Sequence, residues 1–145
     1  MSINLHRVYL SHYYNHLPQQ VFDAWVKPAV MRKWLFESVF NRVVAVETDP
    51  HPGGDFFISE STGDNIIEYH GKYIEIDRPY RLAFTLEIPK YFAGSINVNI
   101  TIDPKLNGSE LTLIQTGTSL KKIESIWNEM LFRLNTVLND ITQRR

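Results

Sequence analysis

The chain has 145 residues, of which 43% are hydrophobic and 21% charged, a balance that excludes an intrinsically disordered protein and fits one globular domain over residues 1–145. Its formal net charge of −1 argues against a dedicated nucleic-acid-binding protein, and the absence of cysteine excludes disulfide scaffolds, zinc ribbons and thiol nucleophiles. No apolar run is long enough to span a membrane and the first residues do not form a secretory signal, so we expect a cytoplasmic protein.

The first third of the chain predicts a strand followed by two short helices. Residues 5–14 are rich in Val, Leu and Tyr, as strands are. Pro18 suits the first turn of a helix, and Lys27 should end that helix because a residue before proline disfavours the α conformation. Pro28 opens a second short helix in the same way. The apolar residues of the two helices follow helical spacing: Val21, Phe22, Trp25, Val30, Met31, Trp34 and Leu35.

The middle of the chain predicts six strands joined by tight turns. Asn107-Gly108 is a strong signal for a two-residue hairpin turn. Gly71 falls inside one of the strands and indicates a bulge there. Apolar and polar residues alternate most clearly over residues 95–103, as in a strand with one buried face. The expected strands are residues 39–48, 55–61, 66–76, 81–88, 95–103 and 110–117.

The C-terminal segment predicts the longest helix, with Ser119 as a candidate N-cap. About 22 residues would span about 33 Å. Its apolar residues recur at steps of three and one and form a single stripe: Leu120, Ile123, Ile126, Trp127, Met130, Leu131, Leu134, Val137, Leu138 and Ile141. Antiparallel strands with one apolar face need a cover, which this stripe offers. We therefore predict an α+β fold in which a curved antiparallel sheet of about seven strands wraps around the C-terminal helix and the two short helices plug one end.

This order of elements, with several local segments, resembles a known family. The segments that carry the likeness are residues 18–25, 28–34, 52–56 and 71–82 and the helix that contains Trp127. The whole order resembles the helix-grip fold of the START-like, polyketide cyclase (SRPBCC) superfamily. The local segments are similar to its AHSA-type branch, which includes the C-terminal domain of the activator of the heat-shock protein 90 ATPase and is linked to the stress response. The resemblance implies a chaperone as a potential partner, although a chain of this length has no room for the activator's separate N-terminal domain.

The histidines do not predict a metal site. His12 and His16 are four residues apart, but on or after a strand their side chains would lie about 13 Å from each other. We expect both to be solvated surface residues, and we expect no metal and no cofactor. His70 lies beside Gly71 and is expected on the strand surface, with a proton-shuttling role in a cavity as the alternative.

The carboxylates and the polar strand residues are also expected at the surface. Glu60, Glu68 and Glu75 have an undetermined strand register, so a cavity-facing general base remains the alternative for each of them. Asn97 and Asn99 should decorate the outer face of the sheet. The sequence contains no nucleophile elbow, P-loop or dinucleotide-binding motif, and no catalytic residue is nominated.

The aromatic residues are the remaining functional signal. A sheet bent around one helix tends to leave one end unfilled, and apolar cavities with a few polar groups are typical ligand sites. We expect a small-molecule-binding domain for an apolar or aromatic ligand, without catalysis. The alternatives are a solid core in a co-chaperone-like interaction module, and a cyclase- or hydrolase-type enzyme that uses a cavity Glu or His. The candidate ligand-binding residues are Trp34, Phe56, Phe84, Val98, Trp127, Met130 and Leu134.

Overall fold

Seven strands and three helices make up the part of the chain that the computed structural model describes, residues 7–36, 42–117 and 123–143. In chain order the elements are β1 (Arg7–Tyr14), α1 (Pro18–Asp23), α2 (Pro28–Trp34), β2 (Arg42–Thr48), β3 (Asp55–Ser61), β4 (Ile66–Asp77), β5 (Arg81–Glu87), β6 (Ile96–Lys105), β7 (Gly108–Thr116) and α3 (Ile123–Gln143). Their order and type are those predicted from the sequence. The proposed N-cap Ser119 lies outside the described residues.

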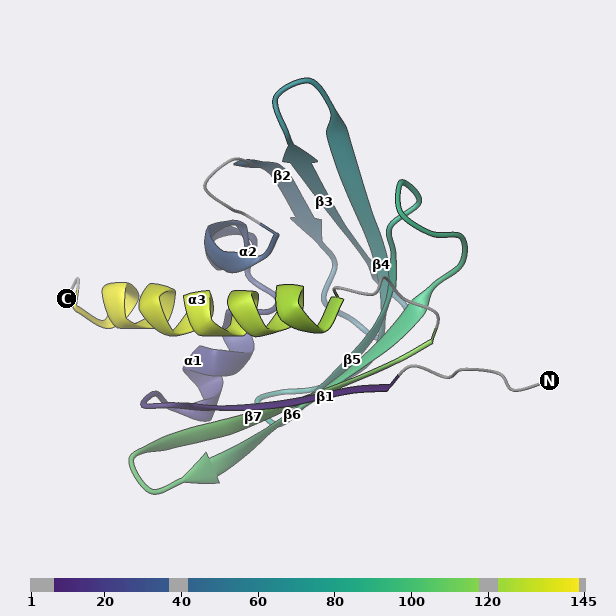
Figure 1. The fold of residues 1–145 in the computed structure, drawn as a ribbon. Coiled ribbons are helices and arrows are strands. Elements are labelled where there is room, and N and C mark those ends of the chain that lie inside the picture. The colour runs from purple at the N-terminus through teal and green to yellow at the C-terminus, as the bar shows by residue number, and fades with distance from the viewer. Residues whose placement is uncertain (1–6, 37–41, 118–122, 144–145) are drawn as a thin grey trace.

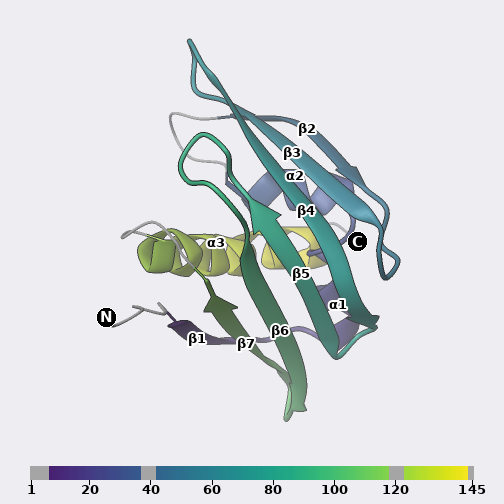
Figure 2. The same ribbon diagram turned by 90° about the vertical axis from the view of Figure 1, so that its right-hand side faces the viewer.

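The seven strands form one antiparallel sheet in the order β1-β7-β6-β5-β4-β3-β2. Strands β2 to β7 are neighbours in sequence order, and β1 adds to the free edge of β7. The sheet curves around α3, with α1 and α2 on the same side of it (Figure 1). Turning the molecule brings the sheet in front of α3, which crosses behind it (Figure 2). This is the predicted helix-grip arrangement.

The core lies between the sheet and the helices. In β6 the side chains of Ile96, Val98 and Ile100 are fully buried, while Asn97 and Asn99 are exposed on the outer face as predicted. The stripe of α3 is buried from Ile123 to Leu138 at its main positions: Ile123, Trp127, Met130, Leu131, Leu134, Val137 and Leu138. Ile141, near the end of the helix, departs from this pattern and is 40% exposed.

Gly71 does not form the predicted bulge. It pairs in regular register with Phe56 on one side and Leu86 on the other. A Cβ atom at this position would fall on the ring of Phe56 and 2.6 Å from the carbonyl oxygen of Thr85, so only glycine fits beneath that ring. The register shift of β4 lies further along, between Tyr73 and Glu75.

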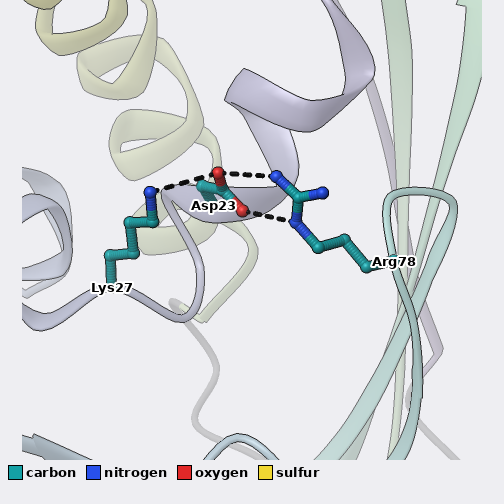
Figure 3. A network of polar contacts seen from close by, with 3 residues as sticks. All are labelled: Asp23, Lys27 and Arg78. Atoms are coloured by element: carbon teal, nitrogen blue, oxygen red, sulfur yellow. Dashed lines mark hydrogen bonds and ion pairs between the residues drawn. The ribbon is translucent and has the colours of Figure 1, made fainter.

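An ion-pair network fastens α1 to the turn between β4 and β5 (Figure 3). The guanidinium of Arg78 donates to both carboxylate oxygens of Asp23, from Nε and Nη2, each at 2.9 Å. Lys27 Nζ lies 3.3 Å from Asp23 Oδ2. Partial burial acts to raise the pKa of Asp23, but the hydrogen bonds and charges of Arg78 and Lys27 together lower it below its ordinary value.

Candidate functional site

A cavity of about 20 Å³ lies between the sheet and the helices. This volume accommodates about one water molecule. Its walls come from the turn after α1, from α2 and the residues that follow it, from strands β3, β4 and β5, and from α3. The lining residues are Trp25, Met31, Leu35, Phe36, Phe56, Ile58, Tyr73, Phe84, Leu86 and Trp127. Most of this surface is hydrocarbon or aromatic ring, as expected for an apolar ligand site.

Aromatic ring contacts surround the cavity, and Trp25 is at their centre. Its ring centroid lies 6.2 Å from that of Phe84 and 6.1 Å from that of Trp127. It also meets Trp34 edge to face at 4.7 Å. The ring of Phe56 is 5.3 Å from those of both Phe84 and Tyr73, so one chain of rings runs from Trp25 to Tyr73. Such contacts stabilise the wall beyond the effect of burial alone.

The structure divides the predicted ligand-binding residues into two groups. Phe56, Phe84 and Trp127 line the cavity. The other four are buried in the core but do not line it: Trp34, Val98, Met130 and Leu134. The indole of Trp34 donates to the carbonyl oxygen of Ala24 at 2.9 Å and so fixes the turn that carries Trp25.

Several residues that line the cavity were not predicted as ligand-binding residues from the sequence. The alternation of inward and outward side chains along the strands could have identified some of them. Ile58 lies two residues after Phe56, and Leu86 lies two residues after Phe84, so each pair shares the inner face of its strand. Tyr73 also faces inward, two residues after Gly71 in β4. Phe36 follows α2, where no periodic pattern applies.

Phe36 has an unusual backbone conformation. Its φ of 58° lies in the left-handed region, which a bulky residue rarely adopts and which costs about 1–3 kcal/mol. The surroundings hold it there. Its ring stacks on Tyr69 at 3.9 Å, and its backbone N–H donates to the sulfur of Met130 at 3.1 Å.

Three buried polar side-chain atoms have no hydrogen-bond partner within the described residues: Trp25 Nε1, Tyr73 Oη and Gln115 Nε2. Trp25 and Tyr73 line the cavity, and Gln115 lies behind Trp127, whose indole N–H donates to Gln115 Oε1 at 2.5 Å. Burial, with the charge of Asp49 as a smaller cause, raises the pKa of Tyr73, so its hydroxyl stays protonated and can donate.

The surface position expected for Glu60 is wrong. Its side chain is buried, and Oε1 accepts a hydrogen bond from Tyr69 Oη at 2.5 Å. Glu60 continues the inward alternation of Phe56 and Ile58, which brings it to the inner face of β3. Burial first, and then the bond to Glu60 and its charge, raise the pKa of Tyr69. Glu68 and Glu75 are exposed, as expected.

The histidine predictions also need one correction. His16 is buried instead of solvated, because Nε2 lies 2.8 Å from Asn139 Oδ1 on α3 and Nδ1 lies 3.3 Å from the hydroxyl of Thr142. His12 likewise contacts α3, with Nε2 2.9 Å from Asn128 Oδ1. His70 lies on the strand surface, 3.2 Å from Glu68 Oε1.

Two further features bear on the class of site. Among the residues that the structure describes, no three His, Asp or Glu side chains come together as a metal site requires. None of the helices in that part of the chain is long and apolar enough to cross a membrane.

Solved structures with this fold come from several bacteria. Protein CV1439 from Chromobacterium violaceum is 21% identical, with a TM-score of 0.82 over 91% of this chain and 96% of that one. Protein SA2116 from Staphylococcus aureus is 15% identical, with a TM-score of 0.82 over 97% of this chain and 98% of that one. CalU16 from Micromonospora echinospora is 17% identical, with a TM-score of 0.69 over 95% of this chain and 79% of that one. At these identities the likeness shows the fold alone.

The sequence comparisons identify the family. No curated protein matches the chain significantly. The family described as Activator of Hsp90 ATPase homolog 1-like protein matches residues 15–139, which is most of the chain. The match begins just before α1 and ends within α3, so it includes every residue that lines the cavity. The chain therefore belongs to the Activator of Hsp90 ATPase homolog 1-like family.

Proposed function

We propose that this protein is a small-molecule-binding domain that holds an apolar or aromatic ligand between the sheet and α3, without catalysing a reaction. The observation that carries the proposal is the aromatic-walled cavity at the place where α1, α2, α3 and the sheet meet. Such a space departs from close packing, because protein interiors contain few voids larger than a water molecule.

A ligand larger than one water molecule requires the wall to move. Phe36 is the wall residue with the most to gain from such a movement, because a return to an ordinary backbone conformation would recover about 1–3 kcal/mol. Its ring covers Tyr69 and approaches Trp127 at 6.1 Å, so a shift of Phe36 would widen the cavity between α2 and α3. Opening of this kind makes a minor conformation the dominant one when a ligand fills it.

A thermal-shift screen tests the proposal directly. Apolar and aromatic compounds, including fatty acids, flavonoids and polyketide-like aromatics, should give saturable shifts. Binding stabilises the folded state by about 2.7 kcal/mol at a hundredfold excess over Kd. Leu86→Phe should abolish the shifts because Leu86 lines the cavity.

The matched control is Leu82→Phe, on the same strand and equally buried but outside the cavity wall. This variant should keep the ligand-induced shifts. If no compound shifts the transition and both variants are equally destabilised, the interior is solid core. A protein-interaction module with a chaperone as partner would then be the better proposal, in line with the family's description.

The buried Glu60–Tyr69 pair favours a second candidate, an enzyme with Glu60 as general base. The carboxylate of Glu60 accepts from Tyr69 Oη at 2.5 Å inside the fold, the pKa of Tyr69 is raised there, and perturbed titratable groups are frequent at functional sites. Glu60→Gln would then abolish turnover of a bound compound and leave its binding unchanged, because a general base acts on the barrier more than on the bound ground state. Unchanged turnover in Glu60→Gln would exclude this candidate.

A further inference from the structure

The two edges of the sheet differ in how well they are protected against pairing with another strand. β1 and β2 are the edge strands, so within the described residues each has one side that no other strand pairs (Figure 2). β2 carries two features that discourage pairing, a register shift between Val43 and Ala45 and a charged residue near each end. β1 pairs with β7 along all eight of its residues without a register shift, contains no Pro or Lys, and is charged only at Arg7, where it begins. A regular strand of this kind is a template for a further strand.

The free edge of β1 has unpaired backbone groups. Across residues 7–36, 42–117 and 123–143, the backbone hydrogen bonds of β1 to other backbone groups all run to β7. The N–H and C=O groups that point the other way are therefore available to a partner, and eight residues of strand present them over about 27 Å.

The three most exposed large aromatic side chains of the described residues flank this edge. Tyr9 is 60% exposed and Tyr13 is 52% exposed, both on the outer face of β1, and Phe132 of α3 is 71% exposed. Asn128, one helical turn before Phe132, contacts His12 of β1, so Phe132 lies on the side of α3 that is next to β1. Exposed aromatic rings thus gather along one unpaired edge, as they do at protein interfaces.

We propose that the free edge of β1 is an interface between two copies of this chain, which pair their β1 strands antiparallel about a two-fold axis at Ser11. The sheet then continues from one copy into the other, and both copies use the same surface. Ser11 faces Ser11 of the second copy, and Tyr9 faces Tyr13 of the second copy on the outer face. On the inner face, Val8 faces Tyr14 of the second copy.

This register makes the strand complementary to itself. It sets outward side chains opposite outward ones and inward side chains opposite inward ones along residues 8–14, as antiparallel pairing requires. It also brings two aromatic side chains together twice, and cross-strand aromatic pairs stabilise a sheet. Arg7 is the only charged residue of β1 and lies at its end, far from Arg7 of the second copy, so no like charges face each other.

The area available is sufficient for a stable dimer. An aromatic side chain buries about 150–250 Å², so the exposed parts of Tyr9, Tyr13 and Phe132 supply up to about 700 Å² from two copies. The two strand edges add the backbone and the remaining side chains over about 27 Å each. Together these contributions reach the total of about 1,000 Å² that a specific interface needs.

Sedimentation velocity of the purified chain over a range of concentrations tests the proposal. The unmodified protein should dimerise with a Kd in the micromolar range, as expected for an interface at the small end of the specific class. A protein that stays monomeric up to millimolar concentration overturns the proposal.

A pair of charge variants tests the register. Ser11 is exposed, and Ser11→Lys would place two ammonium groups opposite each other at the two-fold axis. Ser11→Glu would do the same with two carboxylates. Each variant alone should dimerise at least about tenfold more weakly than the unmodified protein. An equimolar mixture should dimerise about tenfold more tightly than either variant alone, because opposite charges then face each other, and this recovery also shows that both variants are folded.

Val44→Lys is the matched control, at a side chain that is 48% exposed on the other edge strand. It should leave the Kd of the dimer unchanged. A dimer that Ser11→Lys does not weaken, or that Val44→Lys weakens equally, uses another surface and overturns the proposal. A mixture of Ser11→Lys and Ser11→Glu that pairs no better than the separate variants overturns it as well.

Discussion

The two ends of the core are built differently. At one end, the buried apolar side chains of β6 and β7 are aliphatic, and three buried polar groups are paired: Tyr14 with the carbonyl of Leu131, Ser109 with that of His16, and His16 with Asn139. Gln115, also in β7, bonds to Trp127 and belongs to the other end. At the other end the side chains are mostly aromatic and enclose a cavity.

The aromatic end also concentrates the irregular features of the molecule. Phe36 has a left-handed backbone, and the buried Trp25, Tyr73 and Gln115 each have an atom without a partner among the described residues. Register shifts interrupt β2 and β4 in the same half of the sheet. Local rules are usually broken where function requires it, so the aliphatic end supplies stability and the aromatic end is the place to look for a ligand. Three variant comparisons test this contrast, from the largest expected effect to the smallest, and a fourth tests the ion-pair network outside it.

Trp127→Ala should destabilise the protein by about 3–5 kcal/mol, since it removes a fully buried side chain that links the two ends of the core. The same change leaves Gln115 Oε1 without its donor. Equilibrium unfolding in urea measures the loss. A value below about 1 kcal/mol would mean that α3 does not depend on this contact.

Leu82→Phe and Leu86→Phe compare packing within one strand. Both residues are 1% exposed on the inner face of β5, but only Leu86 lines the cavity. Added volume at Leu82 should cost about 1–3 kcal/mol, whereas at Leu86 the cavity accommodates part of the ring and the loss should stay below about 1 kcal/mol. Equal losses in urea unfolding would show that the two sites are packed alike.

Much of the fold that carries these two ends follows from local patterns in the sequence. Alternation placed the strands, Asn107-Gly108 marked a turn in which Asn107 has a φ of 63°, and the stripe of α3 predicted the helix that the sheet wraps around. These features depend on neighbouring residues, so a single sequence specifies them.

The features that the sequence did not predict depend on contacts between distant segments. His16 is buried because α3, more than a hundred residues later, supplies Asn139 and Thr142. The ring of Phe56 in the adjacent strand requires glycine at position 71. From the local sequence alone, the same glycine predicted a bulge. Glu60 is an exception, because its inward position could have been predicted from the sequence. It alternates with Phe56 and Ile58 and therefore lies on the same inner face of β3.

Tyr14→Phe and Tyr73→Phe compare a paired and an unpaired hydroxyl. Loss of the Tyr14 bond to Leu131 should cost about 1 kcal/mol. Removal of the Tyr73 hydroxyl should leave stability unchanged or slightly higher, because a buried donor without a partner is itself unfavourable. Thermal unfolding of the two variants beside the unmodified protein gives the answer. A loss in Tyr73→Phe as large as that in Tyr14→Phe would show that the Tyr73 hydroxyl is satisfied.

The smallest effect is expected at the ion-pair network, which lies outside both ends of the core. Burial acts to raise the pKa of Asp23, but the bonds and charges of Arg78 and Lys27 outweigh it and hold that pKa below its ordinary value of 3.8. Because the folded state binds the proton less tightly than the unfolded state, this contribution to stability is present above the unfolded pKa and is lost as the pH falls through the folded pKa. The difference in unfolding free energy between the unmodified protein and Asp23→Asn should therefore be constant near neutral pH and disappear in acid.

Arg78 is half exposed, so added salt should weaken the effect. Asp64→Asn, at an exposed position in the turn between β3 and β4, should show no such dependence. If Asp23→Asn unfolds identically to the unmodified protein at neutral pH and low salt, the network does not help to fasten α1 to the sheet.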